Sequence, residues 1–149
     1  MKIELRRITY NARLSQETSA YAADVYVDGV KRGTTRNDGN GGADMIHPYT
    51  LQQEIDVYAA TLPPVTSQDG EFLQSAEIIF GDLLADYLTR KDLKRQLAKK
   101  TLFVREGKLY SMKMKGLRPK DAGTSAVVLN DLPFDEAVVV YVKLAEMSA

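Results

Sequence analysis

One short segment contains the residue types best suited to binding a small charged ligand. It is the glycine-rich run Arg36-Asn37-Asp38-Gly39-Asn40-Gly41-Gly42. Glycine and asparagine let the backbone adopt positive φ, so successive N–H groups can point at one position and bind an anion such as phosphate. The run lacks the Lys-Ser/Thr pair of a P-loop and the spacing of a dinucleotide fingerprint. It therefore indicates a phosphate or small-molecule site without naming the ligand, and a plain connecting loop is the alternative.

Residues able to act as catalysts or metal ligands are few. His47 is the only histidine and there is no cysteine, which excludes multi-histidine and thiolate metal sites and a cysteine nucleophile. No serine lies in a nucleophile-elbow motif. His47 follows the glycine-rich loop, so it lies near the candidate site, and a hydrogen-bonding role is favoured over a role as a base. We predict no catalytic residue, no metal and no cofactor.

Charge is distributed unevenly although the formal net charge is zero. Residues 90–120 contain twelve Lys and Arg but two acids, which leaves eight basic and eighteen acidic residues in the other 118. A polarised surface of this kind steers an anionic ligand or a complementary partner, and a solvated lysine-rich face is the alternative. We rank nucleic acid below a small phosphorylated ligand, because the acidic remainder should repel a long polyanion.

The N-terminal residues predict a small antiparallel sheet. Apolar alternation favours strands over 2–10, 19–28 and 30–36. Arg6-Arg7 interrupts the first alternation and indicates a bulge or bend. Asp28-Gly29 is a two-residue turn signal that joins the second and third strands. The glycine-rich loop then follows the open end of this hairpin.

Helices are predicted for the middle of the chain. Thr50 and Gln53 form a capping box for a helix that Pro63-Pro64 ends. A polar linker is predicted over 65–70 and a helix over 71–88. This helix carries a broad apolar stripe, which packs in the core or forms a dimer interface. Gly81 in this helix indicates close packing. Thr89 is expected to cap a further short helix.

The last third predicts a second hairpin and a final element of less obvious type. Residues 101–104 and 108–114 flank the turn Glu106-Gly107. Helical spacing favours a helix from Phe134, although Val138-Val139-Val140 has strand propensity. Together these elements predict an α+β fold in a single domain over 1–149. No apolar run approaches a membrane span and the N-terminus does not resemble a signal peptide, so we expect a soluble cytoplasmic protein.

Several segments of the sequence resemble a group of small phage proteins. These segments are 11–20, 26–33, the 37–42 loop, 93–95 and 99–103. They are similar to the phage Thoeris anti-defence proteins of the first type over roughly residues 1–110. This resemblance implies a protein of the host cytoplasm that binds a cyclic ADP-ribose immune signal and holds it without turning it over, as a homo-oligomer. Asn40 departs from this pattern, in which a larger polar or basic residue is expected.

Such a ligand calls for an amide nest, cations for phosphates and an aromatic surface for a base. Tyr21, Tyr26 and Tyr49 are also available for stacking. The predicted ligand-binding residues are Arg36, Asn37, Gly39, Asn40, Gly41, Gly42, His47, Lys99, Lys100 and Phe103. The alternatives are a nucleotide-cleaving phosphodiesterase or glycohydrolase, and an inhibitor that binds a host defence protein. We expect no membrane partner.

Overall fold

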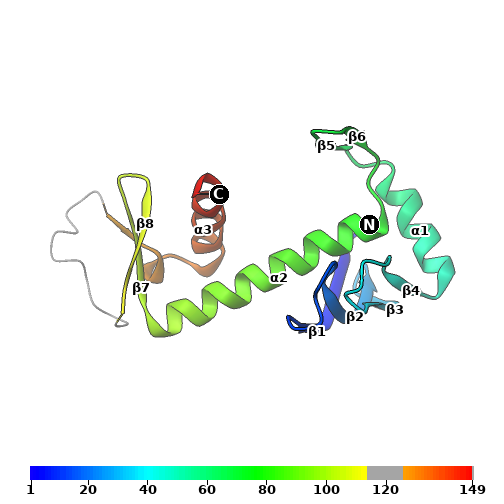
Figure 1. Cartoon of the computed structure of the whole chain (residues 1–149), viewed down its shortest axis with the longest axis horizontal. Coiled ribbons are helices and arrows are strands. Elements are labelled where there is room, and N and C mark those ends of the chain that lie inside the picture. The colour runs from blue at the N-terminus through cyan, green and yellow to red at the C-terminus, as the bar shows by residue number, and fades with distance from the viewer. Residues whose placement is uncertain (114–125, 149) are drawn as a thin grey trace. The chain divides into compact units, whose positions relative to one another are not determined.

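The computed structural model describes residues 1–113 and 126–148 and shows an α+β fold (Figure 1). The chain divides into two compact units, Met1–Leu84 (unit 1) and Ala85–Ala149 (unit 2). The division falls within one long helix, α2 (Ala76–Lys99). The single domain over 1–149 stays a prediction.

Unit 1 is built on a four-stranded antiparallel sheet in the order β1-β2-β3-β4. The strands are β1 (Ile3–Asn11), β2 (Ala20–Val27), β3 (Val30–Asn37) and β4 (Met45–His47). The β1–β2 register shifts between Arg6 and Thr9, where Arg7 has a φ of 53°, so the predicted bulge is confirmed. Asp28 and Gly29 both have positive φ, as a two-residue hairpin turn requires.

The core of unit 1 lies between one face of this sheet and two helical segments. Alternate residues of β2, from Tyr21 to Val27, are buried as predicted. They pack with α1 (Tyr49–Ala59) and the start of α2, where Phe80 is fully buried. The core residues are Val25, Val27, Ile46, Leu51, Ile55, Ala76 and Phe80. The apolar stripe of α2 in this unit therefore serves as core.

The predicted boundaries around α2 are wrong at both ends. Where a polar linker is predicted, β5 (Val65–Ser67) and β6 (Gly70–Phe72) pair as a short hairpin, with Gly70 at a φ of 117°. Phe72 thus belongs to a strand and is half exposed. At the other end α2 continues through Thr89 to Lys99, because no Gly or Pro follows to end it and the apolar spacing continues.

Two local interpretations of the helices are also wrong. The N-cap position of α1 is Pro48 and no side chain caps the helix, so Thr50 and Gln53 form no capping box. Gly81 is exposed, and a Cβ at this position would meet nothing within 4 Å. Close packing therefore does not explain this glycine.

Unit 2 combines the second half of α2 with a three-stranded sheet in the order β8-β7-β9 and a C-terminal helix. Its elements are β7 (Thr101–Arg105), β8 (Lys108–Met112), β9 (Val127–Val128), the 3-10 helix η1 (Leu129–Asp131) and α3 (Phe134–Ser148). The hairpin at Glu106-Gly107 and the final helix are confirmed. The predicted end of the second strand, Met114, lies outside the described residues. The core contains Leu93, Leu102, Leu129, Ala137 and Val138.

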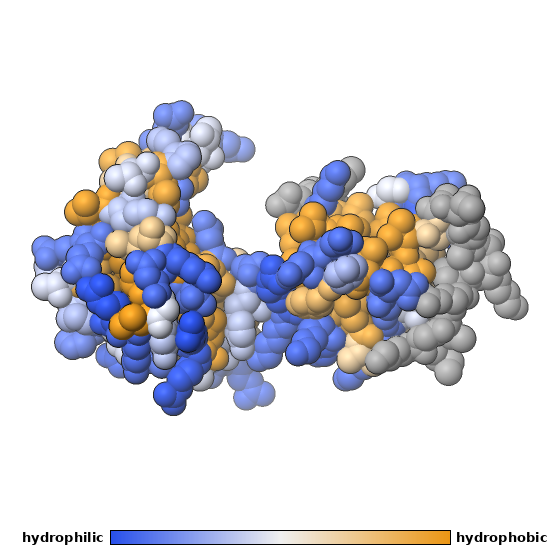
Figure 2. Space-filling model, turned by 180° about the vertical axis from the view of Figure 1, so that it is seen from behind, coloured by the Kyte–Doolittle hydropathy of each residue, from blue (hydrophilic) through white to orange (hydrophobic). Residues whose placement is uncertain are grey.

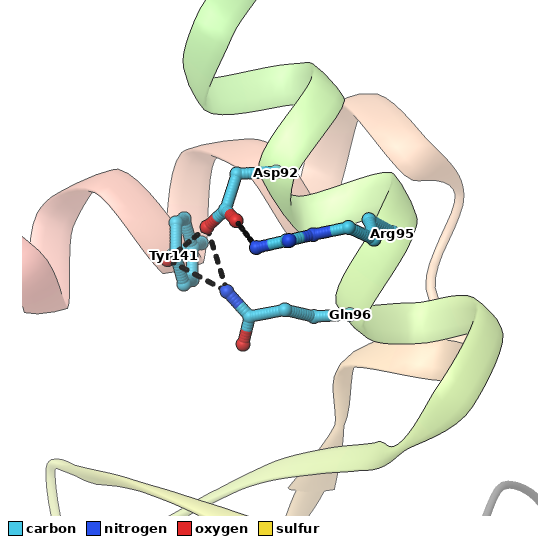
Figure 3. A network of polar contacts seen from close by, with 4 residues as sticks. All are labelled: Asp92, Arg95, Gln96 and Tyr141. Carbon is cyan, nitrogen blue, oxygen red and sulfur yellow. Dashed lines mark hydrogen bonds and ion pairs between the residues drawn. The ribbon is translucent and has the colours of Figure 1, made fainter. Parts of the chain in front are cut away.

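Two polar arrangements connect the elements of unit 2. The Asn130 side chain donates to the carbonyls of Leu97 and Lys100 at 3.3 and 2.8 Å and accepts from the Leu102 N–H at 2.9 Å. The Asn130 side chain therefore provides hydrogen-bond partners for two carbonyls at the end of α2 and for one N–H at the start of β7. In Figure 3 the Asp92 carboxylate of α2 accepts hydrogen bonds from Arg95, Gln96 and the Tyr141 hydroxyl of α3.

The surface combines charged and apolar regions. Hydrophobic residues gather on the face of unit 2 that Figure 2 shows. On α3, Val139 is 67% exposed although its neighbour Val138 is buried. Among the described residues, no helix is both long enough and apolar enough to cross a membrane.

Candidate functional site

A pocket of about 620 Å³ opens where the glycine-rich loop leaves β3. Its walls come from residues 9–11 of β1, residues 20–22 of β2, Leu14, and residues 37, 38 and 40. Two of the predicted ligand-binding residues, Asn37 and Asn40, therefore line it. A volume of this size fits a small organic ligand.

Asn37 at the end of β3 organises the loop that forms one wall of the pocket. Its carbonyl oxygen accepts from the Thr18 hydroxyl at 2.7 Å and from the Gly39 N–H at 2.9 Å. Its amide nitrogen donates to the Gly42 carbonyl at 2.9 Å and to Asp44 at 3.0 Å. The side chain is buried. Asn37 is thus a structural part of the wall, with its hydrogen-bonding atoms already used inside the protein.

The backbone of the loop is fixed by close contact with residues 14–18. The Gly39 carbonyl accepts from the N–H groups of residues 16, 17 and 18. Gly39 and Gly41 have φ values of 85° and 91°, and a Cβ would collide with the Leu14 carbonyl at Gly39 and with the Glu17 carboxylate at Gly41. Gly42 has neither a positive φ nor a close neighbour, so the expectation of positive φ along the glycine-rich run is wrong at Gly42.

The loop amides are shared between internal bonds and solvent. The Gly39 N–H donates to Asn37 and the Gly41 N–H donates to Thr18. Within the described part of the chain, the N–H groups of Asp38, Asn40 and Gly42 donate to no protein acceptor. These three amides, rather than the full run, are available to a ligand.

Carboxylates surround the base of the loop. Tyr21 donates a 2.9 Å hydrogen bond to Asp44, and the Asp44 N–H donates to Glu77 at 2.8 Å. Burial raises the pKa of Asp44, hydrogen bonds from Asn37 and Tyr21 lower it, and the nearby charge of Glu77 raises it further. Burial also raises the pKa of Tyr21 above its ordinary range, so the hydroxyl stays protonated. This acidic setting disfavours a bare phosphate at the base of the loop.

Arg36 supplies a cation beside the pocket. It is exposed on β3 and is the cross-strand partner of Ala22, which lines the pocket. Directly paired residues have Cβ atoms about 5 Å apart, so the long Arg36 side chain can reach the pocket edge. Its guanidinium makes a 3.8 Å contact with the Met45 sulfur, and it forms no ion pair among the residues that the structure describes.

The other predicted site residues lie elsewhere. His47 is exposed on β4 opposite Thr34 and does not line the pocket. Lys99, Lys100 and Phe103 belong to unit 2, where the two lysines are exposed at the end of α2. Phe103 is buried and its ring stacks on Tyr110 with centroids 5.4 Å apart. The structure therefore brings together Arg36 and the predicted residues of the loop. His47, Lys99, Lys100 and Phe103 do not line the pocket with them.

Most residues that line the pocket were not among the predicted ligand-binding residues. Tyr10 is 39% exposed and lines the pocket beside Asn11 and Leu14. Asn11 accepts hydrogen bonds from the N–H groups of Arg13 and Leu14 and so forms an Asx turn. An asparagine at the start of a polar turn could have indicated this from the sequence. Thr18 and Asp44 bind Asn37 but do not line the pocket. They had no local signal, because Thr18 lies 19 residues from Asn37 and Asp44 also contacts Tyr21 and Glu77, which are 23 and 33 residues away.

Comparison of the chain with protein-family models, curated proteins and solved structures finds no match. The resemblance to the Thoeris anti-defence proteins therefore stays a prediction. In the ranges 1–113 and 126–148, no group of three or more His, Asp or Glu residues is placed to hold a metal ion.

Proposed function

We propose that unit 1 binds a nucleotide-like small molecule in the pocket beside the glycine-rich loop and holds it without turning it over. The observation that carries this proposal is the pocket itself, about 620 Å³ in volume, with a loop wall fixed by the four hydrogen bonds of Asn37. A wall fixed before the ligand arrives lowers the entropy cost of binding, which suits tight capture.

The chemistry of the lining favours the nucleoside part of such a ligand inside the pocket. Tyr10 offers a partly exposed ring for a base, and the Asn40 amide and Asp38 carboxylate offer hydrogen bonds for ribose hydroxyls or base N–H groups. The lining contains one carboxylate and no Lys or Arg. The phosphates are therefore expected at the pocket edge, where Arg36 can pair with them.

Sequestration without turnover suits the same lining. No histidine or lysine lines the pocket, and His47 is not among its lining residues. Asp38 is exposed, so it lacks the burial that tunes a carboxylate for acid–base catalysis. Together with the sequence resemblance, these features support a cyclic ADP-ribose isomer as the first ligand to test.

Titration calorimetry tests the proposal directly. The panel contains cyclic ADP-ribose isomers, ADP-ribose, cyclic AMP and adenosine, and bound ligand is recovered by denaturation and identified by mass spectrometry. We expect saturable binding of at least one adenosine-containing compound and recovery of that compound intact. Multiple-turnover conversion would favour a phosphodiesterase or glycohydrolase, and no binding across the panel would contradict the proposal.

A matched pair of variants locates the site. Ala22→Trp places a large side chain in the pocket from an exposed strand position, whereas Ala60→Trp makes the same change on an exposed site of unit 1 outside the pocket. We expect Ala22→Trp to abolish calorimetric binding and Ala60→Trp to leave it unchanged. Equal affinity in the two variants would show that the ligand binds outside the pocket.

A further inference from the structure

The outer side of α2 in unit 2 carries a row of cations. With 3.6 residues per turn, Lys91, Lys94, Arg95 and Lys99 fall within an arc of about 140°. All four side chains are exposed. In the part of the chain that the structure describes, the three lysines form no ion pair, whereas Arg95 is held by Asp92 at 2.7 Å. We call Lys91, Lys94 and Lys99 the lysine stripe.

An exposed aromatic ring lies next to this stripe. Phe134, the first residue of α3, is 38% exposed and shares a hollow of about 290 Å³ with Lys94, Leu97 and Ala98. Arg90 lies 6.0 Å from the ring centroid and pairs with Asp86 at 2.9 Å and Asp135 at 2.7 Å. Both of these carboxylates are therefore neutralised beside the ring.

The two units carry opposite charge. Unit 1 has seven basic and twelve acidic residues, a net charge of −5, and unit 2 has thirteen basic and eight acidic residues, a net charge of +5. A polyanion was expected to be repelled by the acidic residues outside the basic stretch 90–120. Most of those acids belong to unit 1, so unit 2 taken by itself attracts a polyanion.

We propose that unit 2 binds single-stranded nucleic acid, with the lysine stripe on the phosphates and a base stacked on Phe134 in the adjoining hollow. Proteins that bind single strands combine a basic track with aromatic platforms in this way. An unpaired strand is required because a base within a duplex cannot leave its stack at low cost. An acidic peptide without an aromatic or apolar side chain would use the lysines but not the exposed ring and its hollow.

The first test measures how much the lysine stripe contributes electrostatically to the binding of a single strand. Fluorescence anisotropy of the full-length protein with a labelled 15-nucleotide oligothymidine is followed over a series of salt concentrations. Each phosphate contact contributes about 0.7 to the slope of log K against log salt for single strands. Lys91→Gln/Lys94→Gln should therefore flatten the slope by about 1.4 and weaken binding at low salt. Lys108→Gln/Lys143→Gln makes the same charge change at exposed positions of unit 2 and should leave the slope near that of the wild type.

The second test measures stacking. Phe134→Leu keeps an apolar side chain but removes the ring face, and we expect about tenfold weaker binding of the oligothymidine. Val139→Ala, at a more exposed apolar position of α3, is the control and should bind like the wild type. Circular dichroism confirms that each variant is folded. No saturable binding, equal salt slopes for the two double variants, unchanged affinity in Phe134→Leu, or equally tight binding of a duplex of the same length would each overturn the proposal.

Discussion

Asn37 is the residue on which the wall of the candidate pocket depends. One buried side chain joins residues 39, 42 and 44 of its own loop to Thr18, which lies in a separate segment just before β2. Removing it leaves two acceptors and two donors to find other partners in a partly buried setting. Its loss therefore affects both the stability of unit 1 and the shape of the pocket.

We expect Asn37→Ala to lower the free energy of unfolding by about 2–4 kcal/mol, since several partly buried polar groups lose their partners. Asn40→Ala is the control, because Asn40 is an exposed neighbour with no protein hydrogen bond within the described residues, and it should stay within about 0.5 kcal/mol of the wild type. Urea denaturation measures both. Equal stability of the two variants would show that the hydrogen bonds of Asn37 do not stabilise the loop.

Asp44 should titrate above its ordinary pKa of 3.8, chiefly because it is buried. The folded protein then binds this proton more tightly than the unfolded chain does. The contribution of Asp44 to the free energy of unfolding is therefore full below pH 3.8 and is lost as the pH rises through the raised pKa. Carboxyl carbon NMR of the folded protein gives the midpoint directly.

The Tyr21 hydroxyl lowers the pKa of Asp44 through its hydrogen bond. Tyr21→Phe removes this donor, so the Asp44 midpoint should move further upward in the same NMR titration. Tyr10→Phe, a change at the neighbouring cross-strand position, should leave the midpoint in place. A midpoint that falls in Tyr21→Phe would show that the hydroxyl does not stabilise the carboxylate.

At the scale of the elements, Gly81 lies inside α2, which runs without a break from Ala76 to Lys99. Gly81 lies on its exposed side with open space around the missing Cβ, and its φ is not in the positive region. Gly81→Ala should therefore raise the free energy of unfolding by about 0.5–1 kcal/mol, because alanine loses less backbone entropy in a helix. Thermal and urea denaturation measure the gain. A loss of stability would mean that this position is packed after all.

The elements that the sequence predicted well are those fixed by local patterns. The alternation of β2 and the Asp28-Gly29 turn specify the first hairpin, and Glu106-Gly107 specifies the second. The start of α2 and the β5–β6 hairpin were missed, because Phe72 continues the helical spacing and nothing local shows that it belongs to a strand. The pocket was found only through its loop, because Tyr10 joins the lining by the pairing of β1 with β2, which no local pattern shows.

At the scale of the whole molecule, α2 supplies core residues to both units, with Phe80 in unit 1 and Leu93 in unit 2. If the chain is one cooperative domain, as the sequence predicts, damage to the core of unit 2 must also destabilise unit 1. Leu93→Ala removes a fully buried side chain and should cost about 2–5 kcal/mol.

Amide hydrogen exchange separates the two possibilities. In one cooperative domain, the slowest amides of β2 and β3 lose protection in Leu93→Ala by the same free energy as the amides of β7. Unchanged protection in β2 and β3, together with faster exchange in β7, would show that the units unfold independently and would contradict the single-domain prediction.

The central claim is that a small ligand occupies the pocket of unit 1, and amide NMR tests it most directly. Addition of a cyclic ADP-ribose isomer to the labelled full-length protein should shift the amides of residues 9–11 and 38–42 in a saturable, stoichiometric way. The spectrum of the ligand itself should not change over hours. Shifts confined to unit 2, an unchanged protein spectrum, or the appearance of product signals would each contradict the account.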